Sequence, residues 1–245
     1  MVILIAFATF VSTLLGGLFA LRFKDKLHLV LGFSAGAVIS VAFFDLMPEA
    51  IELASGVYDA GTILQFTAVG FLAYLILDRL VFFHAHHSDG EHEHQAHIPH
   101  RSRGILGASS LALHSFLDGV AIGLAFQVSV SVGTVVAVAV LVHDFSDGIN
   151  TVNMILKNSG EKKFAMKWLV IVALAPILGA FSTIFFTLPE SALAVILSVF
   201  AGFFLYIGAT DLIPESHHAH PKLITTVMTL VGVLVLYVAI HIAGV

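Results

Sequence analysis

Eight long apolar stretches dominate the sequence, and each is long enough to cross a lipid bilayer as a helix. A helix needs about 20 consecutive apolar residues to span the hydrocarbon core. The stretches are residues 2–21, 28–51, 61–84, 104–127, 131–156, 166–187, 190–214 and 222–244. We therefore expect an all-α polytopic membrane protein with eight transmembrane helices, joined by short connections except at residues 85–103.

The composition agrees with this class and excludes several others. Hydrophobic residues make up 58% of the 245 residues and charged residues 11%, whereas soluble domains have about 45–50% and about 25%. The net charge of −5 argues against nucleic acid as a partner. The absence of cysteine excludes disulfides, thiolate metal sites and cysteine nucleophiles. We expect residues 1–245 to form a single transmembrane domain in contact with the lipid bilayer.

The basic residues predict the orientation in the membrane. All 11 Lys and Arg residues lie in or beside the loops that follow spans 1, 3, 5 and 7. The opposite loops carry Glu52, Asp59 and Glu190 and no basic residue. Cytoplasmic loops are enriched in Lys and Arg. We therefore expect a protein of the plasma (inner) membrane, with both termini outside and loop 85–103 in the cytoplasm. The first stretch has no basic segment before it, so we interpret it as a span and not as a cleaved signal peptide.

Five aspartates inside the predicted spans have no Lys or Arg next to them in the sequence. A charged residue facing lipid at the helix centre costs roughly 2.5–3.5 kcal/mol, so these carboxylates must face a polar interior, a cavity or a cation. Carboxylates within a membrane mark transport routes by default. The five are Asp45, Asp118, Asp144, Asp147 and Asp211.

The pattern H-x-F-x-D-G occurs twice, once near the middle of span 4 and once near the middle of span 5. It runs from His114 to Gly119 and from His143 to Gly148. Positions i and i+4 share one face of a helix, so each histidine points the same way as the aspartate four residues later. Since the link between the two spans is very short, the spans are antiparallel neighbours and the four side chains can converge.

Two imidazoles and two carboxylates suit Zn²⁺, Fe²⁺ or Mn²⁺. A single buried His/Asp pair could equally hydrogen-bond to a neighbouring helix, but the repetition at matching depth favours a metal site at His114, Asp118, His143 and Asp147. Asp144 and its counterpart Ser115 either form a second, weaker site or, for Asp144, orient one of the ligands. We assign the two motif glycines to close helix packing.

A second internal sequence repeat links spans 2 and 7. Asp45-Leu46-Met47-Pro48-Glu49 resembles Asp211-Leu212-Ile213-Pro214-Glu215, and a glycine precedes each aspartate by nine residues. The two spans run in opposite directions, so the copies are inverted, as in many secondary transporters. We expect Asp45 and Glu49 at the outer mouth of a path, and Asp211 and Glu215 at the inner mouth. The alternative is that these residues only mark helix ends near proline.

Residues 84–100 form a histidine-rich segment, HAHHSDGEHEHQAHIPH. Its polar, repetitive composition is typical of disordered sequence, and histidine tracts bind transition metals. The segment could collect or sense metal on the cytoplasmic side. The alternative is a solvated linker with incidental metal affinity.

At the motifs of spans 4 and 5 the chain resembles the ZIP family (Zrt/Irt-like proteins) of divalent metal transporters. The string HSFLDGVAIG on span 4 is the most specific match, and the span number, the histidine-rich loop after span 3 and the outward termini agree. The resemblance implies eight helices with inverted repeats in a 3+2+3 arrangement, and hence a single transporter domain. It also implies a primary site at His114, Asp118, His143 and Asp147, an adjacent secondary site at Ser115 and Asp144, and a homodimer.

The chain departs from the family pattern at three places. Span 5 reads His-Asp-Phe-Ser-Asp where many relatives have a proline and a glutamate, and Ser115 replaces a frequent asparagine. Span 6 reads VALAPILGA and lacks the glutamate that completes a two-metal site in some relatives. We therefore expect one strong metal site and not a binuclear one.

The leading hypothesis is a transporter that moves Zn²⁺, or alternatively Fe²⁺, Mn²⁺ or Cd²⁺, into the cytoplasm, with no cofactor, no enzymatic activity and no direct use of ATP. The runner-up is an intramembrane zinc hydrolase, in which His114, His143 and Asp118 hold the metal and Asp147 is the base. A third hypothesis is a proton-coupled metal exporter.

Overall fold

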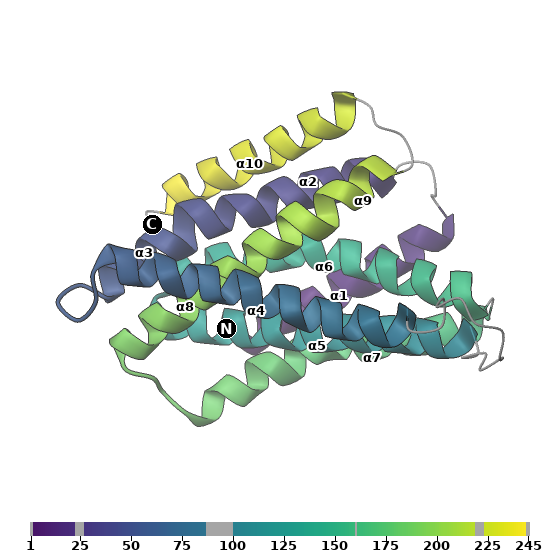
Figure 1. The fold of residues 1–245 in the computed structure, drawn as a ribbon, viewed down its shortest axis with the longest axis horizontal. Helices are drawn as coiled ribbons and strands as arrows, with labels where there is room; N and C mark the ends of the chain where they lie inside the picture. Colours follow the sequence, from purple (N-terminus) through teal and green to yellow (C-terminus); the bar gives the residue numbers. More distant parts are fainter. Residues whose placement is uncertain (1, 23–26, 87–99, 160, 219–222, 244–245) are drawn as a thin grey trace.

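The computed structural model describes the chain apart from residues 1, 23–26, 87–99, 160, 219–222 and 244–245 (Figure 1). Every element of regular structure in the described part is helical. The α-helices are α1 (Val2–Arg22), α2 (Leu27–Val41), α3 (Met47–Leu53), α4 (Ala60–His86), α5 (His100–Val128), α6 (Val130–Ser159), α7 (Lys162–Ser182), α8 (Glu190–Tyr206), α9 (Ile213–His218) and α10 (Leu223–Ala243). The remaining elements are two π-helical segments, η2 (Ala42–Leu46) and η4 (Ile207–Leu212), and one 3₁₀ turn, η3 (Thr183–Phe185).

The eight predicted spans are confirmed, since the described residues contain eight helices that are long and apolar enough to cross a membrane. Most bounds agree within a few residues. Span 6 begins earlier than expected, at Lys162, because lysines can extend a helix beyond the apolar stretch. Span 7 continues past Pro214 to His217, since η4 carries the helix through the proline.

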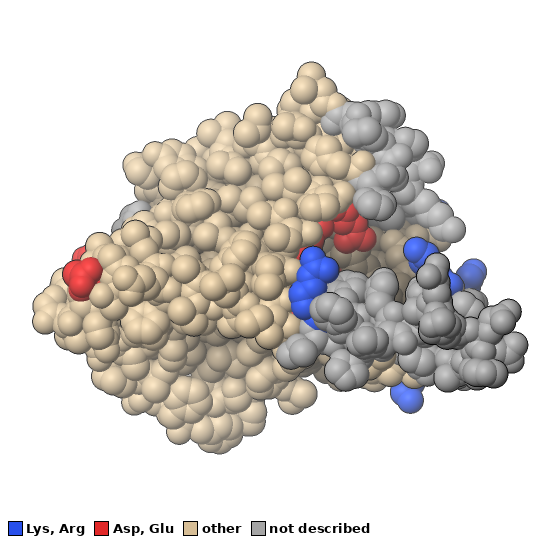
Figure 2. All heavy atoms as spheres, in the orientation of Figure 1, with Lys and Arg blue, Asp and Glu red and all other residues tan. Residues whose placement is uncertain are grey.

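The charged residues divide the molecule into two ends. The helices that carry the basic residues Arg22, Arg79 and Lys157 bring them to one end, which we call the basic end. The other end holds Ser129, the α5–α6 link, and we call it the Ser129 end. Figure 2 shows Lys and Arg gathered towards one end of this face, and acidic atoms at the turn between α3 and α4 at the other.

The helices pack as two groups of four spans. In the first, which we call the site group, α1, α5, α6 and α7 contact one another extensively. In the second, which we call the flanking group, α10 packs along α2 and α4 packs along α8, and the short helices α3 and α9 continue α2 and α8 (Figure 1). The main contacts between the groups are those of α2 with α6 and of α4 with α5.

Close glycine contacts reveal the inverted repeat inside both groups. A Cβ at Gly119 would overlap the carbonyl oxygen of Pro176, and one at Gly179 would overlap that of Phe116. The same reciprocal contact joins α6 to α1, where Gly148 faces the carbonyl of Thr13 and Gly16 that of Phe145. The α5–α7 pair and the α6–α1 pair are therefore built on the same plan, with the H-x-F-x-D-G motif in matching register.

The flanking group repeats this arrangement. Gly36 faces the carbonyl of Thr229 and Gly232 that of Phe33, whereas Gly202 faces the carbonyl of Thr67 and Gly70 that of Val199. The α2–α10 pair thus corresponds to the α8–α4 pair. Glycines let helix backbones approach closely where any side chain would collide, so the packing role predicted for Gly119 and Gly148 is confirmed.

Both D-L-x-P-E segments begin inside a π-helical turn. Pro48 and Pro214 have no backbone N–H and cannot donate to the residue four positions earlier. The backbone N–H of Met47 donates instead to Ala42, and that of Ile213 to Gly208, each five residues back. π-Turns are rare and concentrate at functional sites. Asp45 and Asp211 occupy equivalent places in the two turns.

Candidate metal centre

Four predicted ligands meet between α5 and α6. His114 and Asp118 lie one turn apart on α5, and His143 and Asp147 lie one turn apart on α6. Only Ser129 separates the two helices, and its hydroxyl accepts a hydrogen bond from the backbone N–H of Val132. The two helices are therefore antiparallel neighbours, as predicted. The four residues form a group that we call the His/Asp cluster, with one potential ligand atom of each within 4.8 Å of the others.

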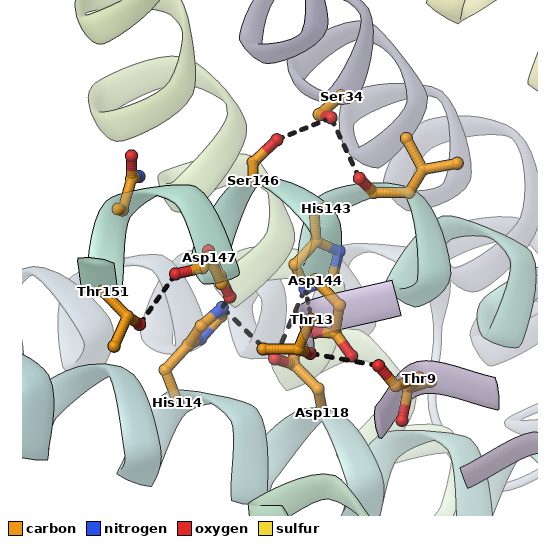
Figure 3. A network of polar contacts seen from close by, with 12 residues as sticks. Thr9, Thr13, Ser34, His114, Asp118, His143, Asp144, Ser146, Asp147 and Thr151 are labelled. Carbon is orange, nitrogen blue, oxygen red and sulfur yellow. Dashed lines mark hydrogen bonds and ion pairs between the residues drawn. The ribbon is translucent and has the colours of Figure 1, made fainter. Parts of the chain in front are cut away.

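The distances within the His/Asp cluster are short (Figure 3). Nε2 of His114 lies 3.2 Å from Oδ2 of Asp118 and 3.3 Å from Oδ2 of Asp147. Nε2 of His143 lies 3.3 Å from the same Oδ2 of Asp118. Both imidazoles and both carboxylates thus point at one small volume.

These converging atoms are buried and lack aligned hydrogen bonds. The exposed fraction is 0% for His143, 3% for Asp118, 4% for Asp147 and 5% for His114. Apart from these mutual contacts, the two Nε2 atoms and the two Oδ2 atoms have no hydrogen-bond partner. Buried polar atoms are normally satisfied because leaving them unpaired is costly. A divalent cation coordinated by two nitrogens and two oxygens would compensate all four, and such a donor set suits Zn²⁺.

The far nitrogen of each imidazole is held by a separate partner. Nδ1 of His143 lies 3.0 Å from the carbonyl oxygen of Ala139, which can only accept, so Nδ1 carries a proton. In the neutral ring, Nε2 then has the lone pair that a metal requires. Nδ1 of His114 lies 3.1 Å from the hydroxyl of Tyr74 on α4. Partners of this kind are typical of histidines that bind metals.

Asp144 lies beside the His/Asp cluster, whereas Ser115 stays outside the group of four. Oδ1 of Asp144 is 3.9 Å from Nε2 of His143, and neither of its carboxylate oxygens has a hydrogen-bond partner. The hydroxyl of Ser115 is buried and unpartnered as well. A second site at these two residues stays a prediction.

The two acidic pairs predicted at the mouths differ in exposure. Asp45 is completely buried and both its carboxylate oxygens are unpartnered, and Glu49 nearby is half-buried. Asp211, at the equivalent position of the other repeat, is partly exposed, and Glu215 is exposed. The acidic pair at the Ser129 end is therefore less accessible than its counterpart at the basic end.

Polar residues that sequence reasoning missed lie near the basic end. Asp78 on α4 accepts a hydrogen bond of 2.9 Å from the hydroxyl of Tyr206, and Asn150 donates one of 3.0 Å to Glu215. Figure 2 shows acidic atoms in a recess between α4, which carries Asp78, and α9, which carries Glu215. Asp78 precedes Arg79 in the sequence, which gave it the pattern of an ordinary interfacial charge.

The predicted histidine-rich loop at 85–103 falls mainly on residues 87–99, which lie outside the described residues. Its role in metal binding therefore stays a prediction.

Comparisons with known proteins agree with this architecture. The family model of the ZIP zinc transporter matches residues 84–239. A zinc transporter ZupT of Shigella dysenteriae serotype 1 is 28% identical over 227 residues, which cover 90% of this chain and 86% of that protein. A zinc transporter ZupT of Salmonella paratyphi A is 26% identical over 222 residues, covering 88% of this chain and 84% of that protein. The matched region contains both H-x-F-x-D-G helices and the second half of the inverted repeat, and the chain belongs to the ZIP family.

Proposed function

We propose that this membrane protein moves divalent transition-metal cations, Zn²⁺ foremost, into the cytoplasm, with the His/Asp cluster as the transport site. Membership of the ZIP family supports divalent metal transport, and zinc is the metal in the names of the relatives. The observation that carries the proposal is the convergence of four buried ligand atoms within 4.8 Å on two membrane-spanning helices, with no hydrogen-bond partner outside the cluster.

The donor set explains how a divalent cation could be held inside a membrane after it has lost its water. Two carboxylates balance the charge of a divalent ion, and two imidazoles with free Nε2 lone pairs favour zinc over purely oxygen-seeking cations. Ligands from two helices of the same group keep their mutual geometry when that group moves. The cluster would therefore travel with the metal as one unit.

The proposed route runs from Asp45 and Glu49 at the Ser129 end to Asp211 and Glu215 at the basic end. The concentration of Lys and Arg at the basic end supports a cytoplasmic position for it, with both termini outside. The more accessible acidic pair at the basic end would then make this conformation inward-facing. If the two repeats exchanged their conformations, the site group would rock against the flanking group and the Ser129 end would open.

Three further features belong to the same proposal. The whole chain acts as one transporter domain of the plasma (inner) membrane, working as a homodimer. The histidine-rich loop 85–103 collects or senses the metal on the cytoplasmic side. Asp144, 3.9 Å from Nε2 of His143, together with Ser115 offers a weaker neighbouring site.

The hydrolase hypothesis is not favoured. A catalytic zinc site uses three protein ligands and keeps one position for water. The His/Asp cluster instead offers one atom from each of four residues, and the members of the matching family are transporters.

The proposal is tested by zinc uptake into proteoliposomes that contain an internal fluorescent indicator. Wild-type protein should take up Zn²⁺, and His143→Ala should lose at least nine-tenths of the initial rate. His241→Ala is the matched control, because His241 is an exposed histidine on α10. Equal uptake by wild type and His143→Ala, or no uptake by wild type, would contradict the proposal.

A further inference from the structure

We propose that Tyr74 is a positioning residue of the transport site, which holds the imidazole of His114 so that Nε2 faces the metal. The inference rests on the proposed function, since it assigns a role towards the His/Asp cluster. The hydroxyl of Tyr74 lies 3.1 Å from Nδ1 of His114, and its ring meets the imidazole edge to face at 5.8 Å between centroids. Tyr74 is 8% exposed, so water does not compete freely for this contact.

The two histidines of the cluster are supported in different ways. His143 is held by the carbonyl of Ala139, one turn back on its own helix, at 3.0 Å. This support moves with the site group. The support of His114 comes from α4, which belongs to the flanking group. The hydrogen bond that orients His114 therefore depends on where the flanking group lies. The hydrogen bond of His143 does not, although its ring also meets Phe204 of α8 edge to face at 5.7 Å between centroids.

The position of the Tyr74 hydroxyl is itself fixed by the packing of α4 against α8. The reciprocal contacts of Gly70 and Gly202 bring these two helices together one turn away. The Tyr74 ring then packs at 5.4 Å from Phe203 and 5.2 Å from Tyr206.

A hydrogen bond between α8 and α4 adds to this packing of the Tyr74 ring. The hydroxyl of Tyr206 donates at 2.9 Å to Oδ2 of Asp78, which lies one turn after Tyr74 on α4. α4 and α8 thus hold the Tyr74 ring between them, and its hydroxyl is presented to His114 as part of the flanking group.

The contact fits the chemistry that metal binding requires. When Nε2 of His114 donates its lone pair to a cation, Nδ1 carries the ring proton and needs an acceptor. The phenolic oxygen of Tyr74 is that acceptor. Partners of this kind fix the tautomer and the ring orientation, and removing them typically lowers metal affinity about 10–100-fold.

The inverted repeat does not duplicate this support. The matched contacts of Gly70 and Gly232 align α4 with α10, and the residue that corresponds to Tyr74 is Leu236. Leucine has no polar atom to offer to His143. When the repeats exchange conformations, the hydroxyl of Tyr74 leaves His114 and no equivalent hydroxyl arrives, so this contact belongs to the present conformation alone.

The test compares Tyr74→Phe with wild type in the proteoliposome assay. Phenylalanine keeps the ring in its packing and removes only the hydroxyl. We expect the KM for Zn²⁺ uptake to rise about tenfold while thermal stability stays that of the matched control Tyr237→Phe, a hydroxyl loss on the exposed face of α10. Manganese relies on oxygen ligands and less on imidazole, so the concentration of Mn²⁺ that halves Zn²⁺ uptake should fall in Tyr74→Phe.

The outcomes separate the two proposals. A wild-type protein without uptake overturns the proposed function and this inference with it. Wild-type uptake with an unchanged KM in Tyr74→Phe overturns the inference alone. A third outcome is an equal rise in the KM for Zn²⁺ and in the Mn²⁺ concentration that halves uptake, together with a lowered unfolding temperature. This result would show that Tyr74 only supports the fold, and it would also overturn the inference.

Discussion

At the residue scale, the carboxylate of Asp45 is unpaired although it lies away from the His/Asp cluster. It is completely buried, and neither oxygen has a hydrogen-bond partner. An unsatisfied buried polar group costs about 1–3 kcal/mol, so the residue lowers stability in this conformation. A carboxylate that becomes useful only when the Ser129 end opens would explain its presence.

The substitution Asp45→Leu tests this explanation. Removing two unpartnered oxygens should raise the stability of the empty protein by about 1–3 kcal/mol, seen as a higher unfolding temperature, while Zn²⁺ uptake falls severalfold. Glu52→Leu is the matched control, because Glu52 is an exposed acid a short way along the same span, and we expect it to change uptake little. A destabilised Asp45→Leu protein with normal uptake would show that Asp45 is only a helix-end residue.

The four ligands could be predicted from the sequence because the i, i+4 spacing and the short link determine their meeting point. Tyr74 could not, since its approach to His114 depends on packing between distant helices. One hydroxyl in an apolar span carries no periodic signal that separates it from an interfacial tyrosine. Asp78 was missed for the same reason, because its partner Tyr206 lies 128 positions away in the sequence.

At the scale of the elements, reciprocal glycine contacts set the distances between helices. The contact of Gly119 with the Pro176 carbonyl fixes α5 against α7, and its counterpart at Gly148 fixes α6 against α1. The sequence predicted a packing role for these glycines but not their partners, since no local pattern says which helix approaches. The π-helical turns before Pro48 and Pro214 were not predicted either. Proline explains the missing donor, whereas the change to a five-residue hydrogen bond depends on the surrounding helices.

Gly119→Ala should therefore destabilise the protein by about 1–3 kcal/mol, because its Cβ would meet the backbone oxygen of Pro176, which cannot turn aside. Gly107→Ala on the same helix is the matched control. Its Cβ would meet only the end of the flexible Met154 side chain, and alanine favours a helix over glycine. Unfolding temperatures in detergent measure the difference. Equal temperatures for the two variants would contradict the packing role of Gly119.

At the scale of the whole molecule, polar contacts between the two groups stabilise the conformation described over the exchanged one that the proposed transport requires. Asn150 donates to Glu215, Ser34 pairs with Ser146 at 2.9 Å, and Tyr74 pairs with His114. The repeat equivalents of Asn150, Ser34 and Tyr74 are Ala121, Phe200 and Leu236, whose side chains form no hydrogen bonds. The exchanged conformation therefore lacks these three contacts, and the empty protein should rest in the conformation described.

Removing one contact between the groups should raise the population of the exchanged conformation. Asn150→Ala loses a hydrogen bond worth about 1 kcal/mol, which corresponds to a population change of about fivefold. The chain contains no cysteine, so Ala121→Cys is a clean reporter. Ala121 is 3% exposed, and it should become accessible when the Ser129 end opens.

We expect thiol labelling of Ala121→Cys to be severalfold faster when combined with Asn150→Ala. Asn158→Ala is the matched control, since Asn158 donates to Met154 within its own helix at 2.8 Å and does not join the groups. Identical labelling rates in all three backgrounds would contradict the role of Asn150.

The measurement that tests the central proposal most directly is the position of zinc in crystals of the protein soaked with Zn²⁺, located by anomalous scattering at the zinc edge. We expect a peak bound by His114, Asp118, His143 and Asp147, with Zn–N distances of about 2.0–2.1 Å, and the loss of this peak in His143→Ala crystals. Zinc bound elsewhere on the molecule, with no peak between α5 and α6, would contradict it.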